Sequence, residues 1–214
     1  VDVDPVEPLT LKGKAEPVPA YRLVTVRATG EGHNRHLDSP MVGREKELEV
    51  LSRALERTGT ERTSYLFTVL GPAGVGKSRL TQEFLSGPAA GATMLFGRCL
   101  SYGEGITFYP LSEMVQRAAA IAEADELPTI RQKLRDVLGG SDDPERTAVL
   151  VGGLLGWDPP ASDEEAFWGV RKLFEHLAVG RPLVLVFDDL HWAEPTFLDL
   201  VEYLSDWTRD SSIL

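Results

Sequence analysis

The stretch GPAGVGKS, residues 71–78, limits what this chain can fold into more than any other feature. It has the four fixed residues of the pattern G-x-x-x-x-G-K-[ST], which are Gly71, Gly76, Lys77 and Ser78. The apolar run 65–70 before it predicts a strand buried on both faces, as in a parallel sheet. After it, Leu80 and Phe84 share one face of an expected helix. Strand, glycine-rich turn and helix together form the setting in which this pattern binds phosphate.

The chemistry of a polyphosphate explains these residue types. Glycines let the main chain wrap closely enough for its N–H groups to meet phosphate oxygens. The first N–H groups of the helix also point at the anion, and the helix dipole favours negative charge there. Lys77 would reach the β- and γ-phosphates of ATP or ADP, and the Ser78 hydroxyl would ligate Mg²⁺. The predicted nucleotide contacts are Gly71, Pro72, Ala73, Gly74, Val75, Gly76, Lys77, Ser78 and Arg79. The alternative is a glycine-rich turn with a surface lysine.

A second acidic motif lies more than a hundred residues later. The apolar run 182–187 is followed by Asp188 and Asp189, which places two carboxylates at the carboxyl end of a predicted strand. Ligands of open α/β sheets bind at that end. This is the Walker B arrangement, in which Asp188 would hold Mg²⁺ opposite Ser78 and Asp189 would orient or deprotonate the attacking water. One aspartate is enough, because Mg²⁺ keeps several of its waters. The alternative is two solvated aspartates in a turn.

Composition excludes several other classes of protein. The formal net charge of −11 argues against direct nucleic-acid binding, which needs clustered Lys and Arg. A single cysteine, Cys99, cannot form an intrachain disulfide and fits a reducing compartment. No apolar run approaches the ~20 residues that cross a bilayer, and no basic-then-apolar signal opens the chain. The sequence therefore predicts a cytoplasmic protein with no membrane partner.

The first 28 residues have a different residue pattern from the rest of the chain. Two short strands are expected, Pro8–Leu11 and Tyr21–Val26, and nearby prolines confine them to edge strands or irregular extended chain. The chain opens at Val1 without methionine, which suggests a segment of a longer protein. PLTLKGKAEPVPAYRLVTV resembles the carboxy-terminal hairpin of class III adenylate/guanylate cyclase domains. The resemblance implies the tail of an upstream cyclase domain that lacks that family's metal-binding aspartates. The alternative is an ordinary polar hairpin.

The expected domain organisation follows from these changes in residue pattern along the chain. Residues 1–28 are the cyclase-like tail, 29–40 a linker and 41–214 an ATPase domain without its lid and last strands. The linker contains His33 and His36, which we interpret as solvated histidines rather than metal ligands because no cysteine or carboxylate cluster joins them.

Helices are expected throughout the middle of the domain. A helix opens near Met41–Glu45, with Leu48, Leu51 and Leu55 on one face. Residues 92–99 predict a second buried strand. Residues 111–156 have a helical pattern that is interrupted by glycine pairs and prolines. Ser162 and Glu165 form a capping-box pattern before a further helix. Ser211–Leu214 reads as the start of another buried strand.

Residues 38–214 are similar to the STAND and AAA-like ATPase modules of multidomain signalling proteins. The segments that carry this resemblance are MVGRE, GRCLSYGEGITFYPL, EEAFWGVRKLFEHLAVGRPLVLV and FDDLHWAEPTFLDLVEYL. It implies a P-loop NTPase fold of three α/β/α layers around a parallel sheet, with a helical insertion before the Walker B strand. It also implies adenine contacts from Met41 and Val42. His191 has two interpretations, a polar sensor of the γ-phosphate or a hydrogen-bonded loop histidine beside a packed Trp192.

Three functions are compatible with these motifs. The first is a nucleotide-controlled switch that binds Mg·ATP, hydrolyses it slowly, and controls an adjoining cyclase or a downstream helical-repeat or effector domain. Such modules also precede LuxR-type helix-turn-helix domains in transcriptional regulators. The second is an oligomeric AAA-like ATPase with vigorous turnover, and the third is a scaffold that binds no nucleotide. The intact motifs argue against the scaffold. The lack of an arginine-finger motif behind Arg98, Arg171 or Arg181 favours the switch.

Overall fold

The computed structural model describes residues 2–9, 18–25, 41–101 and 107–214. The chain divides into two compact units, Val1–Pro40 and Met41–Leu214. In the first unit β1 (Asp2–Leu9) and β2 (Val18–Thr25) form an antiparallel pair in which Pro5 lies opposite Tyr21. The first strand therefore starts earlier than the range 8–11 predicted for it, of which residues 10 and 11 lie outside the described residues. The predicted linker 29–40, with His33 and His36, lies outside the described residues.

Two parallel strands form the centre of the second unit. They are β3 (Thr93–Arg98) and β4 (Leu183–Asp188), and Arg98 is the register partner of Asp188. Side chains alternate between the two faces of a strand. In β4 Val184 and Val186 pack with the α1–α2 side of the core, whereas Leu183, Leu185 and Phe187 pack with the larger cluster on the other side. The same alternation places Asp188 on the α1–α2 side.

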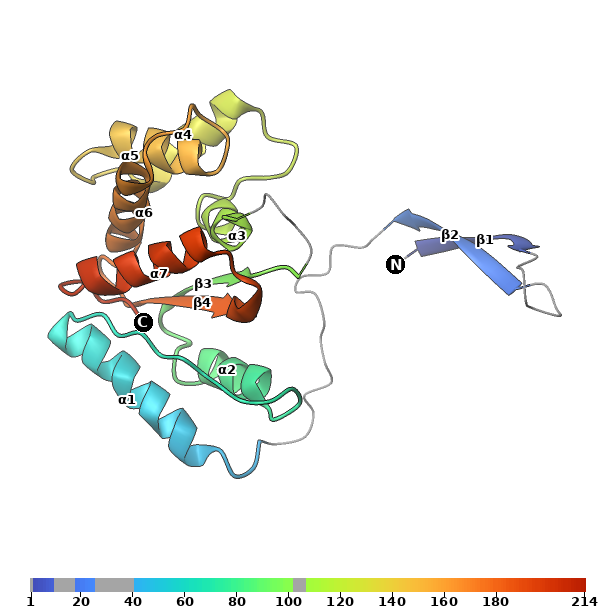
Figure 1. The fold of residues 1–214 in the computed structure, drawn as a ribbon, viewed down its shortest axis with the longest axis horizontal. Coiled ribbons are helices and arrows are strands. Elements are labelled where there is room, and N and C mark those ends of the chain that lie inside the picture. Colours follow the sequence, from blue (N-terminus) through green and yellow to red (C-terminus); the bar gives the residue numbers. More distant parts are fainter. Residues whose placement is uncertain (1, 10–17, 26–40, 102–106) are drawn as a thin grey trace. The chain divides into compact units, whose positions relative to one another are not determined.

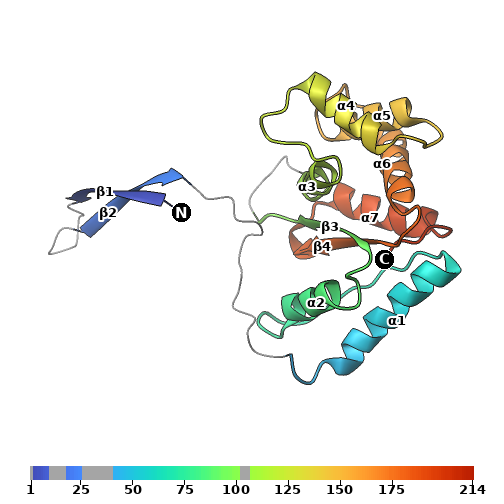
Figure 2. The same ribbon diagram turned by 180° about the vertical axis from the view of Figure 1, so that it is seen from behind.

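Helices cover both faces of this sheet (Figures 1 and 2). On one side lie α1 (Glu45–Glu61) and α2 (Lys77–Ser86), and on the other α3 (Tyr109–Ala118), α6 (Asp163–Leu177) and α7 (Pro195–Trp207). Helices α4 (Leu127–Val137) and α5 (Pro144–Leu154) complete the insertion between β3 and β4, and the short 3-10 helix η1 (Leu190–Trp192) follows β4. The predicted α/β class, with a parallel sheet and a helical insertion, is confirmed.

The helix boundaries follow ordinary capping chemistry. The hydroxyl of Ser162 accepts a hydrogen bond from the Glu165 N–H at 3.4 Å, and three acidic residues in the first turn of α6 complement the helix dipole. The bond from the Glu165 N–H is one half of the predicted capping box; in place of the other half, the Glu165 carboxylate accepts from the Ser162 hydroxyl at 3.3 Å rather than from the Ser162 N–H. Asp143 caps α5 in the same way. Prolines occupy the first turn of α4, α5 and α7, where a missing N–H costs nothing.

The prediction of a buried strand at residues 65–70 is wrong in this structure. The segment is extended but outside the sheet, and four of its apolar side chains are exposed: Leu66, Phe67, Val69 and Leu70. A strand inside a sheet needs a ladder of neighbours, and the segment makes one such bond, from the Tyr65 N–H to the Ile213 carbonyl at 3.0 Å. Ile213 in turn forms a parallel bridge with Leu183 of β4. The predicted strand start at Ser211–Leu214 is thus present as a short pairing with β4, in which backbone hydrogen bonds of Ser212 and Leu214 to Leu183 and Leu185 flank this bridge.

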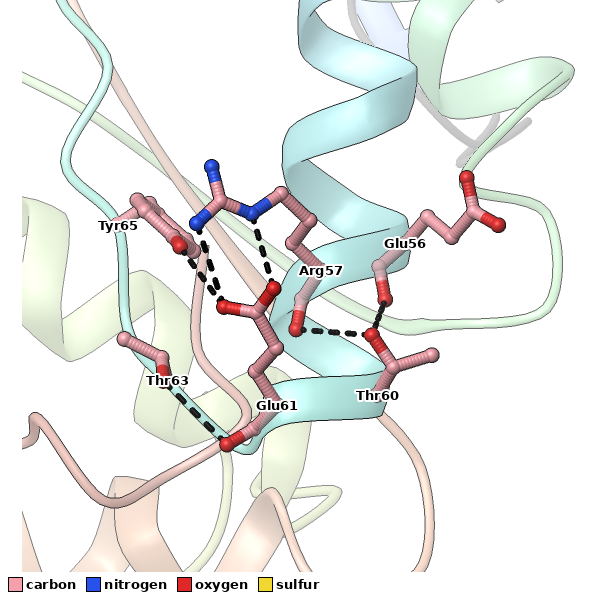
Figure 3. Close-up of polar contacts among 6 residues, drawn as sticks. All are labelled: Glu56, Arg57, Thr60, Glu61, Thr63 and Tyr65. Carbon is pink, nitrogen blue, oxygen red and sulfur yellow. Dashed lines mark hydrogen bonds and ion pairs between the residues drawn. The ribbon is translucent and has the colours of Figure 1, made fainter.

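A polar cluster holds the exit from α1 toward the glycine-rich loop (Figure 3). Arg57 donates two hydrogen bonds to Glu61, at 3.1 and 3.3 Å, and its guanidinium lies 5.3 Å from the centre of the Tyr65 ring. The Tyr65 hydroxyl donates to the same carboxylate at 3.4 Å. The hydrogen bonds from Arg57 hold the pKa of Glu61 below its ordinary value. This cluster ties the start of the 65–70 segment to the end of α1.

Among the residues that the structure describes, no helix is long and apolar enough to span a bilayer.

Candidate functional site

The glycine-rich loop has the backbone that its sequence demands. Gly74 and Gly76 have positive φ angles of 79° and 97°, which residues with a Cβ rarely adopt, and α2 begins directly afterwards at Lys77. The N–H groups in the first turn of a helix have no acceptor within the helix. Residues 71–75 are exposed. The loop therefore presents backbone donors to solvent at the positive end of a helix dipole, which is an anion-binding arrangement.

Lys77 is folded back onto its own loop. Its ammonium group donates to the Gly71 carbonyl at 2.8 Å and to the Pro72 carbonyl at 3.2 Å. Ser78, the next residue, is exposed, and its hydroxyl has no hydrogen-bond partner among the described residues. Both side chains are therefore available to a ligand, once the lysine leaves two neutral carbonyls.

The two aspartates stand at the carboxyl end of β4. Asp189 has a left-handed backbone with φ of 57°, and its N–H donates to Oδ1 of Asp188 at 3.0 Å. This turn ends the strand and starts η1. Asp188 and Asp189 keep 31% and 45% of their side-chain surface exposed, so both remain accessible from solvent.

The loop and the aspartates lie at one edge of the domain. Val184 of β4 packs in the same cluster as Leu80 and Phe84 of α2, and Asp188 follows on the same face of the strand. In Figures 1 and 2 the start of α2 lies toward the same end of the sheet as the carboxyl ends of β3 and β4. The predicted triphosphate contacts and the predicted magnesium ligand Asp188 therefore share one face and one edge.

An arginine on the neighbouring strand completes this edge. Nη2 of Arg98 lies 3.1 Å from Oδ2 of Asp188, and its Nε lies 3.9 Å from Oδ2 of Asp189. From the sequence alone, Arg98 is one of three arginines that have no arginine-finger motif around them. The register of β3 against β4 creates this pair, and strand register cannot be read from one strand alone.

The segment before α1 reaches the loop through a residue that sequence reasoning missed. Arg44 donates from Nη2 to the Val75 carbonyl at 3.2 Å and pairs with Glu47 at 2.7 Å. Of the two predicted adenine contacts, Met41 packs against the α1–α2 core, whereas Val42 is 81% exposed. Val42 is therefore the freer of the two to contact a base.

The surroundings of His191 in the loop after β4 do not fully match either interpretation, a sensor of the γ-phosphate or a hydrogen-bonded histidine beside a packed Trp192. The His191 ring is exposed and lies 4.9 Å from the Trp192 ring. Trp192 is itself half exposed and lines a small cavity of about 30 Å³ with Cys99 and Glu194, so it is not a packed core residue. Within the described part of the chain the His191 ring has no hydrogen-bond partner.

The other two arginines considered as fingers lie elsewhere. Arg171 in α6 pairs with Glu175 at 3.6 Å and lies over the Trp207 ring. Arg181 is exposed in the turn before β4. Neither has an ion pair to Asp188 or Asp189 in the described residues.

Cys99 lies directly behind the carboxylates. Its N–H donates to the Asp188 carbonyl at 3.0 Å, and the residue is buried. Burial first, and then the negative charges of Asp189 and Asp188, raise the pKa of the Cys99 thiol from 9.0 to about 11. The thiol is therefore protonated at neutral pH and is a packing residue of this edge rather than a nucleophile.

These residues fit Mg²⁺ held together with a polyphosphate. Across the described residues no three His, Cys, Asp or Glu side chains gather into a metal site. A cation held by protein alone is thus not expected there, but Mg²⁺ needs only one or two protein oxygens when phosphates and waters supply the rest. The free hydroxyl of Ser78 and the accessible carboxylate of Asp188 are donors of that kind.

Comparison with known proteins agrees with this geometry. The model of the AAA ATPase domain family matches residues 40–214. An uncharacterized protein of Rhizobium meliloti (strain 1021) is 28% identical over 219 residues, which cover 89% of this chain and 20% of the relative. The chain thus spans about a fifth of that relative's length, and no solved structure matches it. The chain belongs to the AAA ATPase domain family and is a nucleotide-binding P-loop ATPase domain.

Proposed function

We propose that residues 41–214 bind Mg·ATP and act as a regulatory switch that hydrolyses the nucleotide slowly. The observation that carries the proposal is that both essential charges already have partners within the protein. Lys77 is bonded to the Gly71 and Pro72 carbonyls, and Asp188 is paired with Arg98. A nucleotide must replace these contacts, so bound and free forms differ in local structure. Such a difference is what a switch transmits.

The proposed roles follow from position. The N–H groups at the start of α2 and the Lys77 ammonium bind the phosphates, and Ser78 with Asp188 would hold Mg²⁺, which neutralises the charge on the phosphate oxygens when it is bound. Asp189, half exposed beside Asp188, orients or deprotonates a water molecule. Val42 and Met41 border the base. Slow turnover is supported by the pairing of Arg98, since this arginine neutralises the carboxylates instead of standing free beside a γ-phosphate.

Thermal unfolding of the 214-residue chain tests nucleotide binding. ADP or ATP with Mg²⁺ at a hundred times its Kd should stabilise the chain by about 2.7 kcal/mol. Lys77→Ala should abolish the shift, whereas Lys46→Ala, an exposed lysine on α1, should leave it unchanged. An unchanged melting temperature in the wild-type chain would favour a scaffold. Steady hydrolysis at tens of turnovers per second, rising with protein concentration, would favour the vigorous oligomeric ATPase.

We further propose that the parent is a multidomain signalling protein, with a cyclase domain before this ATPase and a helical-repeat, LuxR-type or other effector domain after it. The antiparallel pairing of β1 with β2 supports a hairpin like that of the cyclase tail. The relative, about five times longer than the matched region, supports a multidomain parent. The reading frame on either side tests this proposal. Cyclase metal-binding aspartates upstream would support it, and a frame without them would contradict it.

A further inference from the structure

Arg98 is the cation already present at the predicted magnesium position. Its guanidinium contacts Oδ2 of Asp188 at 3.1 Å and Oδ2 of Asp189 at 3.9 Å. In the part of the chain that the structure describes, no other lysine or arginine pairs with either aspartate. The two carboxylates carry two negative charges and Arg98 supplies one positive charge, so this group of three side chains has a net charge of −1.

The fold fixes the backbone of Arg98 but leaves its side chain free to move. Arg98 is the last residue of β3 and the register partner of Asp188, and its N–H donates to Oε2 of Glu113 on α3 at 3.1 Å. Its side chain nevertheless keeps 50% of its surface exposed. The guanidinium can therefore leave Asp188 for solvent by rotation about side-chain bonds, without a change in the sheet.

A divalent cation and this guanidinium would compete for the same carboxylate oxygen. Oδ1 of Asp188 is engaged by the Asp189 N–H, and Oδ2 is engaged by Arg98. A cation bound at Oδ2 would lie beside the like charge of the Arg98 guanidinium, whose Nη2 is 3.1 Å from that oxygen, and like charges at short range repel. Binding of one therefore opposes binding of the other.

We propose that Arg98 is a positioning residue that competes with Mg²⁺ for Asp188 and so sets the Mg²⁺ concentration at which the domain binds nucleotide. The inference rests on the proposed function, because it concerns the same Mg·nucleotide site. In the ligand-free protein Arg98 holds the Walker B carboxylates together. On binding of the magnesium complex the guanidinium is released from Asp188, and the site responds to free Mg²⁺ as well as to nucleotide.

The test is a Mg²⁺ titration of the full chain at fixed ADP, read as the shift in melting temperature. ADP is used because it lacks the γ-phosphate, which a freed arginine could contact. Removal of the competitor in Arg98→Gln should lower the half-saturating Mg²⁺ concentration by about twofold to fivefold, as expected for the loss of one partly exposed ion pair. Arg98→Lys keeps the positive charge and should stay close to wild type. Arg53→Gln removes an exposed arginine of a helical ion pair, and should change nothing.

Each possible result of this titration either supports or overturns the role proposed for Arg98. Equal half-saturating concentrations in wild type and Arg98→Gln would overturn it, and so would a higher concentration in the variant. Weaker binding of ADP without Mg²⁺, at an unchanged Mg²⁺ midpoint, would make Arg98 a phosphate ligand and would also overturn it. A wild-type chain that shows no shift with any nucleotide overturns the proposed function, and this inference with it. A wild-type shift with the predicted separation of midpoints supports both.

Discussion

At the scale of single residues, Gly97 lies where β3 and α3 approach each other closely beside the site. A Cβ at this position would lie 2.3 Å from the Pro110 carbonyl oxygen and 2.8 Å from its carbonyl carbon, so the end of β3 touches the backbone at the start of α3. Because the obstacle is main chain, it cannot rotate away. Gly97→Ala should destabilise the chain by about 1–3 kcal/mol, the cost of overpacking a core. Urea unfolding measures the change.

Gly91 provides the matched control for that substitution. A Cβ at Gly91 meets nothing within 4 Å, and the residue precedes the same strand. Gly91→Ala should therefore cause no loss of stability, because exposed substitutions without a special contact stay within about 0.5 kcal/mol. Equal stability of the two variants would show that the approach of Pro110 to β3 is not as close as described.

Cys99 makes stability depend on pH in the alkaline range. Its pKa is about 11 in the folded chain and 9.0 as its ordinary value, so the folded state favours the protonated thiol. Below about pH 9 the thiol is protonated in both states and the contribution is fully present. Between pH 9 and 11 the unfolded chain loses its proton first, and the contribution is lost as the pH rises.

The wild-type chain should therefore lose roughly 2 kcal/mol more stability than Cys99→Ala between pH 9 and 11, since each pKa unit corresponds to about 1.4 kcal/mol. Urea unfolding at several pH values gives the difference between the two slopes, in which other titrating groups cancel. Parallel slopes would contradict the raised pKa. Faster alkylation of the thiol by iodoacetamide at pH 8 than that of a model thiol would contradict it independently.

At the scale of elements, the segment before the glycine-rich loop and the helix after it differ in burial. Leu70 is 85% exposed, whereas Leu80 is 6% exposed and packs with Phe84 and Val184. Leu70→Ser should change the free energy of unfolding by less than about 0.5 kcal/mol. Leu80→Ala should cost about 2–5 kcal/mol, because it leaves a cavity between α2 and the sheet. A large loss from Leu70→Ser would show that residues 65–70 form a buried strand after all.

Much of the element order was predictable because local chemistry decides it. The glycines at positive φ, the Ser162 cap, and the apolar run ending at Asp188 are each specified within a few residues. The strands at 92–99 and 182–189 and the helix at α1 therefore appear close to their predicted bounds. Short-range patterns of this kind do not depend on the rest of the fold.

The remaining features depend on which elements become neighbours. The apolar pattern of 65–70 predicts a strand, but strand formation needs a partner, and the segment meets only Ile213. Similarly, nothing in the local sequence indicates that Arg98 faces Asp188 or that Arg44 reaches the Val75 carbonyl. Such contacts are set by strand register and by the packing of α1 beside the loop, and these are properties of the folded domain.

At the scale of the whole molecule, two distant motifs meet at one edge of one sheet. The start of α2 and the end of β4 come from positions 77 and 188, and packing of α2 against β4 places them on the same face. Each brings one oxygen donor suited to Mg²⁺, from Ser78 and from Asp188. The central claim is that these two donors serve a single Mg·nucleotide complex.

A double-mutant cycle on the Mg²⁺-dependent part of ADP binding tests that claim most directly. The measured quantity is the ratio of ADP affinity with saturating Mg²⁺ to that without it, in wild type, Ser78→Ala, Asp188→Asn and the double variant. If both side chains hold one ion, each single substitution removes most of the Mg²⁺ enhancement and the double variant loses little more, since coupled residues are not additive. An enhancement that survives in Asp188→Asn, or losses that simply add, would contradict the account.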